Sequence, residues 1–260
     1  MSESGWTSAE GERWLARAME RELPAMLALA QRLTGDPVAA EDAVQDALER
    51  AWRSRAQLRQ AGAAQAWMRS ILARRVVDLH RRERNESPAG AAGELEELLM
   101  PDVEDPAGVV AAAEDEERMR AALRALAEPD RVALVLHDGE GWTAAQVAEL
   151  LGTGVAAAQK RVQRARSKLV GSLASAVASR APAGACTSAR RQAHGLLDGG
   201  LDPRARHTLE RHLASCPHCP AALQAATGVL ARLRRLPEGP VSDALAERLR
   251  GLIREGFEAR

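Results

Sequence analysis

The stretch TAAQVAELLGTGVAAAQKRVQRARSKL, residues 143–169, decides the fold of the second half of the chain. Thr143 with Gln146 is a capping-box start for one helix, and Gly152 suits its C-terminal end. After the turn, apolar residues recur at spacings of three and four, a pattern that buries one stripe of a second helix. Outside that stripe lie the basic residues Lys160, Arg161, Arg164, Arg166 and Lys168, with no acid between 153 and 168.

Two helices joined by a tight, glycine-containing turn, with a basic second helix, form the helix-turn-helix arrangement. The second helix of such a motif can enter the major groove of DNA and place its N-terminal side chains on base edges. A solvated basic face on an ordinary helical hairpin is the simpler interpretation. The one-sided charge, the cap and the turn together favour DNA binding.

Three more helices are expected toward the N-terminus, at residues 12–33, from Asp36 to about 53, and at 64–84, and they form one bundle. The second has an apolar face opposite the polar residues Glu41, Asp42, Gln45, Asp46 and Glu49. The third buries an apolar stripe and is otherwise crowded with Arg69, Arg74, Arg75, Arg81, Arg82 and Arg84.

Composition predicts an all-α protein, because the apolar residues are mostly Ala, Leu and Val, with no Tyr and one Phe. The formal net charge of zero hides a strong asymmetry. Residues 50–84 hold ten Arg against two acids, whereas residues 85–117 hold eleven acids, three prolines and no Lys or Arg. The second segment is therefore expected to be an acidic linker.

Beyond a second linker of small residues at 172–185, four helices and a metal-type cluster are expected. Residues 212–219 read HLASCPHC, in which His212 and Cys216 share a helix face and Cys219 follows after a tight turn. With Cys186 as the fourth ligand, these donors suit one tetrahedral Zn²⁺. Cysteines without a metal, and a catalytic zinc, remain alternatives. His194, His207 and His218 are candidate substitutes for a ligand.

Residues 35–53, 66–82 and 123–169 resemble the two conserved regions of a bacterial extracytoplasmic-function (ECF) RNA polymerase sigma factor, and the resemblance covers roughly residues 20 to 171. It implies a helical domain that binds the β′ clamp helices of core RNA polymerase and reads the −10 promoter element. It also implies a helix-turn-helix that reads the −35 element.

Carried over by position, the resemblance assigns polymerase binding to Glu41, Asp42, Gln45 and Asp46, and DNA binding to Arg69, Arg74, Arg75, Arg81, Lys160, Arg161, Arg164 and Arg166. The chain departs from the family before Trp67, where an aromatic-rich stretch is usual. It departs again at Ala156 and Ala157, where Gly and Thr are common, so the −35 bases cannot be inferred.

Residues 186–258 resemble the zinc-containing anti-sigma domain, which is usually a separate protein and whose signature is His-x3-Cys-x2-Cys with an upstream Cys or His. The resemblance implies an intramolecular contact with the sigma domains. The expected organisation is sigma region 2 at 12–84, the acidic linker at 85–117, sigma region 4 at 118–171, the flexible linker at 172–185, and the zinc-binding regulatory domain at 186–258.

The overall expectation is a cytoplasmic, non-enzymatic transcription factor with no membrane partner, autoregulated by its C-terminal metal- or redox-responsive domain. A permanent structural zinc is the alternative within that interpretation. A stand-alone helix-turn-helix regulator that never engages polymerase, with a purely structural zinc module, is the alternative from a different class.

Overall fold

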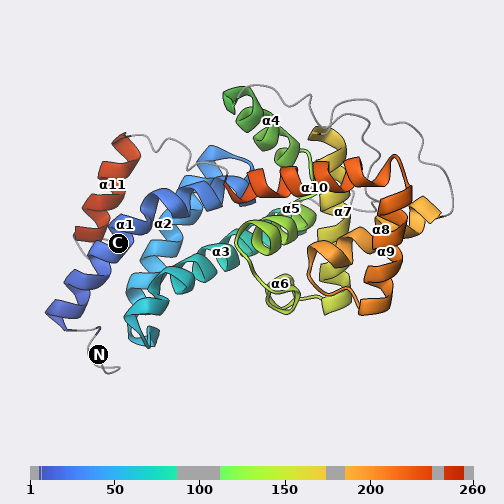
Figure 1. The fold of residues 1–260 in the computed structure, drawn as a ribbon. Helices are drawn as coiled ribbons and strands as arrows, with labels where there is room; N and C mark the ends of the chain where they lie inside the picture. The colour runs from blue at the N-terminus through green and yellow to red at the C-terminus, as the bar shows by residue number, and fades with distance from the viewer. Residues whose placement is uncertain (1–5, 7, 87–111, 174–184, 236–242, 255–260) are drawn as a thin grey trace. The chain divides into compact units, whose positions relative to one another are not determined.

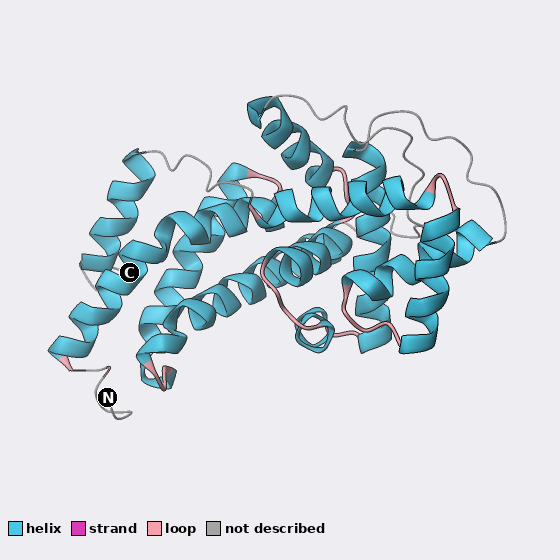
Figure 2. Cartoon of the chain, viewed as in Figure 1, coloured by secondary structure: helices cyan, strands magenta, loops and turns pink. Residues whose placement is uncertain are grey.

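The computed structural model describes residues 6, 8–86, 112–173, 185–235 and 243–254, and within these ranges it contains helices and no strand (Figures 1 and 2). The all-α prediction is confirmed. The chain divides into two compact units, residues 1–90 with 237–260, and residues 91–236.

The first unit is built on α1 (Ala9–Thr34), α2 (Pro37–Arg53) and α3 (Ala64–Glu86), which pack against one another, with two short 3-10 turns at Arg55–Gln57 and Ala61–Ala63. The chain turns sharply after α1 because Gly35 adopts a left-handed φ of 74°. Asp36 then caps α2 by accepting hydrogen bonds from the backbone N–H groups of Val38 and Ala39.

The core of the first unit comes from the apolar stripes expected from the sequence. Leu48, Met68, Leu72 and Val76 are all buried, as is most of the apolar side of α1. The stripe of α3 drifts near its end, where Leu79 is half-buried and His80 is buried instead.

The second unit begins with α4 (Ala112–Arg124), α5 (Glu128–Leu134), the π-helical turn η4 (Val135–Gly139), α6 (Ala144–Leu151) and α7 (Val155–Leu173). Helix α6 starts with the capping box of Thr143 and Gln146 and ends at Gly152, whose φ is 64°. Helix α4 begins six residues before the boundary expected at residue 118, so the end of the acidic segment is helical. The rest of that segment, 87–111, lies outside the described residues.

The four helices expected at the C-terminal end are all present. Three of them form what we call the C-terminal module, namely α8 (Ala185–Leu197), α9 (Pro203–Ser215) and α10 (Cys219–Arg234), in the second unit. Helix α10 also packs against α7 and η4. The fourth helix, α11 (Asp243–Arg254), belongs to the first unit and packs against α1 and, less extensively, α2 (Figure 1).

Candidate polymerase, DNA and metal sites

The four residues assigned to polymerase binding lie together on α2. Asp42 is exposed, while Glu41, Gln45 and Asp46 are half-buried. The Asp46 carboxylate accepts a hydrogen bond of 2.7 Å from Nε of Arg75 on α3. Nη2 of Arg248 on α11 lies 3.9 Å from a carboxylate oxygen of Glu41. The surface is therefore acidic, and its members differ in how much they are already occupied.

The basic residues of α3 divide in the same way. Arg74 and Arg81 are exposed. Arg69 lies 3.5 Å from Glu22 of α1, and Arg75 pairs with Asp46, so each helps to join α3 to a neighbouring helix. Arg74 and Arg81 are thus the more accessible of the four for a phosphate backbone.

On α7, the assigned DNA-binding residues occupy three different environments. Lys160 is exposed. Arg164 donates two hydrogen bonds of 2.6 Å to the carboxylate of Asp130 on α5, and these hydrogen bonds raise the Arg164 pKa. Arg161 lies 3.5 Å from the same carboxylate. Asp130 itself is buried, so the sequence-predicted basic face is anchored by an acid of another helix.

Arg166 points into the protein, with only 1 % of its surface exposed. It donates two hydrogen bonds of 2.6 Å to Asp138 of η4 and one of 2.5 Å to Asp198, the residue after α8. In this conformation Arg166 is not available to DNA. A signal for its burial exists in the sequence, since Val162, Arg166 and Val170 are spaced by four residues on the apolar side of the helix.

The four predicted metal ligands come together in one cluster. The donor atoms of Cys186, His212, Cys216 and Cys219 all lie within 4.8 Å of one another, and we call this group the Cys₃His cluster. It joins the N-terminal ends of α8 and α10 to the C-terminal end of α9. His207 is exposed and His194 is buried, and neither belongs to the cluster.

The spacing inside the cluster fits a tetrahedral ion. Tetrahedral Zn²⁺ with Zn–S bonds of about 2.3 Å and Zn–N bonds of about 2.0 Å separates its ligand atoms by about 3.5–3.8 Å. The Cys186 and Cys216 sulfurs lie 3.7 Å apart, and Nε2 of His212 lies 3.3 Å from the Cys219 sulfur. All three cysteines are free thiols rather than a disulfide.

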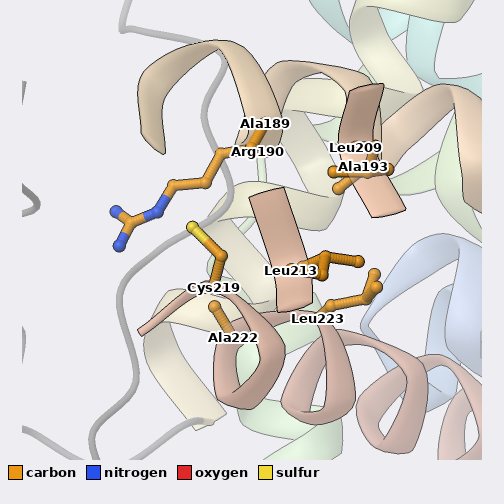
Figure 3. A pocket seen from close by; sticks show the side chains of 8 residues that line it. All are labelled: Ala189, Arg190, Ala193, Leu209, Leu213, Cys219, Ala222 and Leu223. Carbon is orange, nitrogen blue, oxygen red and sulfur yellow. The ribbon is translucent and has the colours of Figure 1, made fainter. Parts of the chain in front are cut away.

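The electrostatics of the cluster also call for a cation. Burial, together with the neighbouring Cys216 thiol, raises the pKa of Cys219 to about 12. For Cys216, hydrogen bonds from the backbone N–H groups of Cys219 and His218 outweigh burial and lower the pKa. Cys219 lines a small cavity with Arg190, and its sulfur points toward that side chain (Figure 3). A metal ion would hold all three sulfurs as thiolates.

Comparison with known families places each part of this geometry. Residues 18–86 match Sigma-70 region 2, residues 116–169 match Sigma-70, region 4, and residues 186–219 match the family described as "Putative zinc-finger". The last range begins and ends on cysteines of the Cys₃His cluster.

The ECF RNA polymerase sigma factor SigL of Mycobacterium tuberculosis is 31 % identical over 160 residues, which make up 61 % of this chain and 88 % of SigL. The chain belongs to the ECF sigma factors. Two further relatives of this sigma factor are each 36 % identical. They are "Probable RNA polymerase sigma factor RfaY" of Xanthomonas campestris, matched over 54 % of this chain, and SigJ of M. tuberculosis, likewise over 54 %. The sigma factor spans 35 % of the length of RfaY and 45 % of that of SigJ.

This sigma factor therefore combines the two conserved sigma regions with a helical module that carries a Cys₃His cluster. Among the described residues, no helix has the length and apolar character needed to cross a membrane.

Proposed function

We propose that this sigma factor binds core RNA polymerase through the acidic face of α2 and directs initiation at promoters read by α3 and α7. The observation that carries the proposal is the division of charge between sigma regions. The α2 face presents the exposed acid Asp42, whereas α3 and α7 present the exposed bases Arg74, Arg81 and Lys160. Opposite charges serve opposite partners, a protein surface and a phosphate backbone.

We further propose that the Cys₃His cluster holds one Zn²⁺. Three thiolates and one imidazole are the donor set that a closed structural zinc site uses, and the measured separations suit it. Such an ion supplies cross-linking of α8, α9 and α10, which are too short to hold a large core of their own.

Autoregulation by the C-terminal helices is the third part of the proposal. Two contacts support it. Helix α11 packs on α1 and α2 with Arg248 beside Glu41, a residue of the proposed polymerase face. Separately, Asp198 and Arg234 of the C-terminal module bond to Arg166 and Asp138 of the helix-turn-helix unit. Tethering raises the effective concentration of such contacts, so weak interfaces suffice to compete with a partner.

The deciding experiment is run-off transcription with core RNA polymerase, the full chain and a library of randomised promoters. Transcripts from a defined two-element promoter are expected. A truncation that keeps residues 1–180 retains α7 and removes the C-terminal helices. We expect it to transcribe more than the full chain. Equal activity of both proteins, with and without added zinc or oxidant, would contradict autoregulation while leaving the sigma function intact.

Polymerase binding separates a sigma factor from a stand-alone DNA-binding regulator. Asp42→Lys is the sharpest substitution, because Asp42 is exposed, whereas Asp46 also pairs with Arg75 inside the domain. Asp78→Lys makes the same charge change at an exposed position of α3 and serves as the control. We expect Asp42→Lys to weaken binding to core polymerase and Asp78→Lys to leave it unchanged. Undiminished binding by Asp42→Lys would remove α2 from the interface.

A further inference from the structure

A set of charged contacts joins the C-terminal module to the helix-turn-helix unit. We call it the Arg166 network. It comprises Arg166 of α7, Asp138 of η4, Asp198 and Arg234. Two of its members belong to the sigma region and two to the module. Arg166 and Asp138 are 1 % and 3 % exposed, so solvent screens their interaction only weakly.

The geometry of the network makes Asp138 its centre. Both Asp138 carboxylate oxygens accept from Arg166, one from Nε and one from Nη2, and Nη2 also donates to Asp198. Nε of Arg234 donates a 2.9 Å hydrogen bond to the backbone carbonyl of Asp138. That carbonyl lies at the end of a π-helical turn, where backbone acceptors lack partners within the turn.

His137, Asp138 and Asp198 place three donors of the kind that bind metals within 4.8 Å of one another. The two Asp138 oxygens are already engaged by Arg166, so the group serves an ion pair. Removing Asp198 would leave the Arg166–Asp138 pair complete. Asp198 is thus the part of the network that can leave without stranding a buried charge.

The positions of these residues along their helices reveal a shared arrangement. Helix α8 has Cys186 in its first turn, and Asp198 follows its last residue, about 18 Å away at 1.5 Å per residue. Helix α10 begins at Cys219 and ends at Arg234, about 22 Å away. Both helices therefore carry a ligand of the Cys₃His cluster at one end and a contact to the sigma region at the other.

We propose that the Cys₃His cluster fixes the angle between α8 and α10 and so holds Asp198 and Arg234 against Arg166 and Asp138. The proposal rests on the metal binding proposed above. Because a helix is stiff, a rotation of about 10° at the cluster displaces the far end of α8 by about 3 Å. That displacement is enough to break the hydrogen bond between Asp198 and Arg166. Metal binding at one end of the module is thereby coupled to the helix-turn-helix at the other.

Trp142 provides a reporter at the sigma-region end. It lies between η4 and α6, and its backbone N–H donates to the carbonyl of Leu136 in η4. The other four tryptophans, at 6, 14, 52 and 67, belong to the first unit. In the full chain labelled with 5-fluorotryptophan, Trp142→Phe assigns the Trp142 ¹⁹F resonance.

The test compares zinc-loaded and chelator-treated full chain, with metal content checked by mass spectrometry. Chelation is expected to shift the Trp142 resonance of the wild type. In Asp198→Asn and Arg234→Gln, the loaded protein is expected to resonate near the chelated position already. Arg235→Gln is the matched control, because Arg235 is the exposed neighbour of Arg234. It is expected to behave as the wild type.

Coupling is reciprocal, so the two network variants are also expected to bind zinc roughly fivefold more weakly, or worse, than the Arg235→Gln control in a chelator competition titration. The inference is overturned if chelation leaves the wild-type Trp142 resonance in place, or shifts it equally in all variants, or if zinc affinity is unchanged. A purified chain with no stoichiometric zinc would overturn both this coupling and the proposed zinc site. Run-off transcription reports on the sigma function independently of either result.

Discussion

Arg164 of α7 holds Asp130 of α5 through two hydrogen bonds of 2.6 Å, across 34 residues of sequence. The carboxylate is 3 % exposed and the guanidinium side chain 28 % exposed, so the pair lies at the edge of the helix-turn-helix core. Arg164 consequently contributes to the position of α7 as well as to its charge.

Arg164→Ala is therefore expected to destabilise the second unit by about 2 kcal/mol, because it strips the main partner from a buried carboxylate. Lys160→Ala, on the same helix but exposed, is expected to change stability by less than about 0.5 kcal/mol. It should instead weaken promoter binding and reduce its salt dependence. Urea unfolding and fluorescence polarisation at several salt concentrations separate the effects. Equal loss of stability in both variants would contradict the assignment.

Metal content is expected to be one zinc per chain, lost in His212→Gln and Cys186→Ser. His207→Gln is the control, because His207 lies on the same helix as His212 and is exposed outside the cluster. It should retain zinc fully. Elemental mass spectrometry on dialysed protein gives the ratio directly. Zinc retained by Cys186→Ser at full affinity would show that another residue, such as His218, completes the site.

The pH dependence of stability should carry a contribution from Asp138. Burial alone would raise its pKa, but hydrogen bonds from Arg166 and His137 outweigh burial and lower it. A lowered folded-state pKa stabilises the protein above the unfolded value of about 3.9 and loses that contribution as pH falls below it. Unfolding free energies measured from pH 7 downward should therefore fall more steeply for the wild type than for Asp138→Asn below about pH 4. Parallel curves would exclude this origin.

Helix α11 is expected to compete with polymerase for the first unit. Leu249 is fully buried there, so Leu249→Asp should release α11 and increase the affinity for core polymerase several-fold. Arg250→Glu is the control, since Arg250 is exposed and its ion pair is with Glu247 of the same helix. Binding to immobilised core enzyme measures the difference. Unchanged affinity of Leu249→Asp would mean that α11 does not cover a polymerase surface.

The sequence predicted the features that local patterns determine. Apolar periodicity placed α1, α2, α3 and the two helices of the helix-turn-helix. The capping box at Thr143 and the left-handed Gly152 are formed as expected, because both depend on residues within one turn. The Cys₃His cluster was also predictable, since His212, Cys216 and Cys219 are fixed relative to one another by a helix end and a turn.

Long-range relationships were not predictable in this way. Arg166 was expected at the DNA, but its partners lie 28 residues before it and 32 residues after it, and no local pattern connects them. The amphipathic character of α11 predicts a buried face without saying which surface covers it. Its packing against α1 depends on residues more than 200 positions away.

The order of the segments along the chain has a consequence in time. Ribosomes release the N-terminal part first, and about 190 residues separate the end of α2 from the start of α11. At ~5–20 residues per second, roughly 10–40 s pass between the synthesis of these two helices. Every new molecule therefore goes through a nascent stage in which the α1–α2 surface already exists and the helix that packs on it has not yet been made.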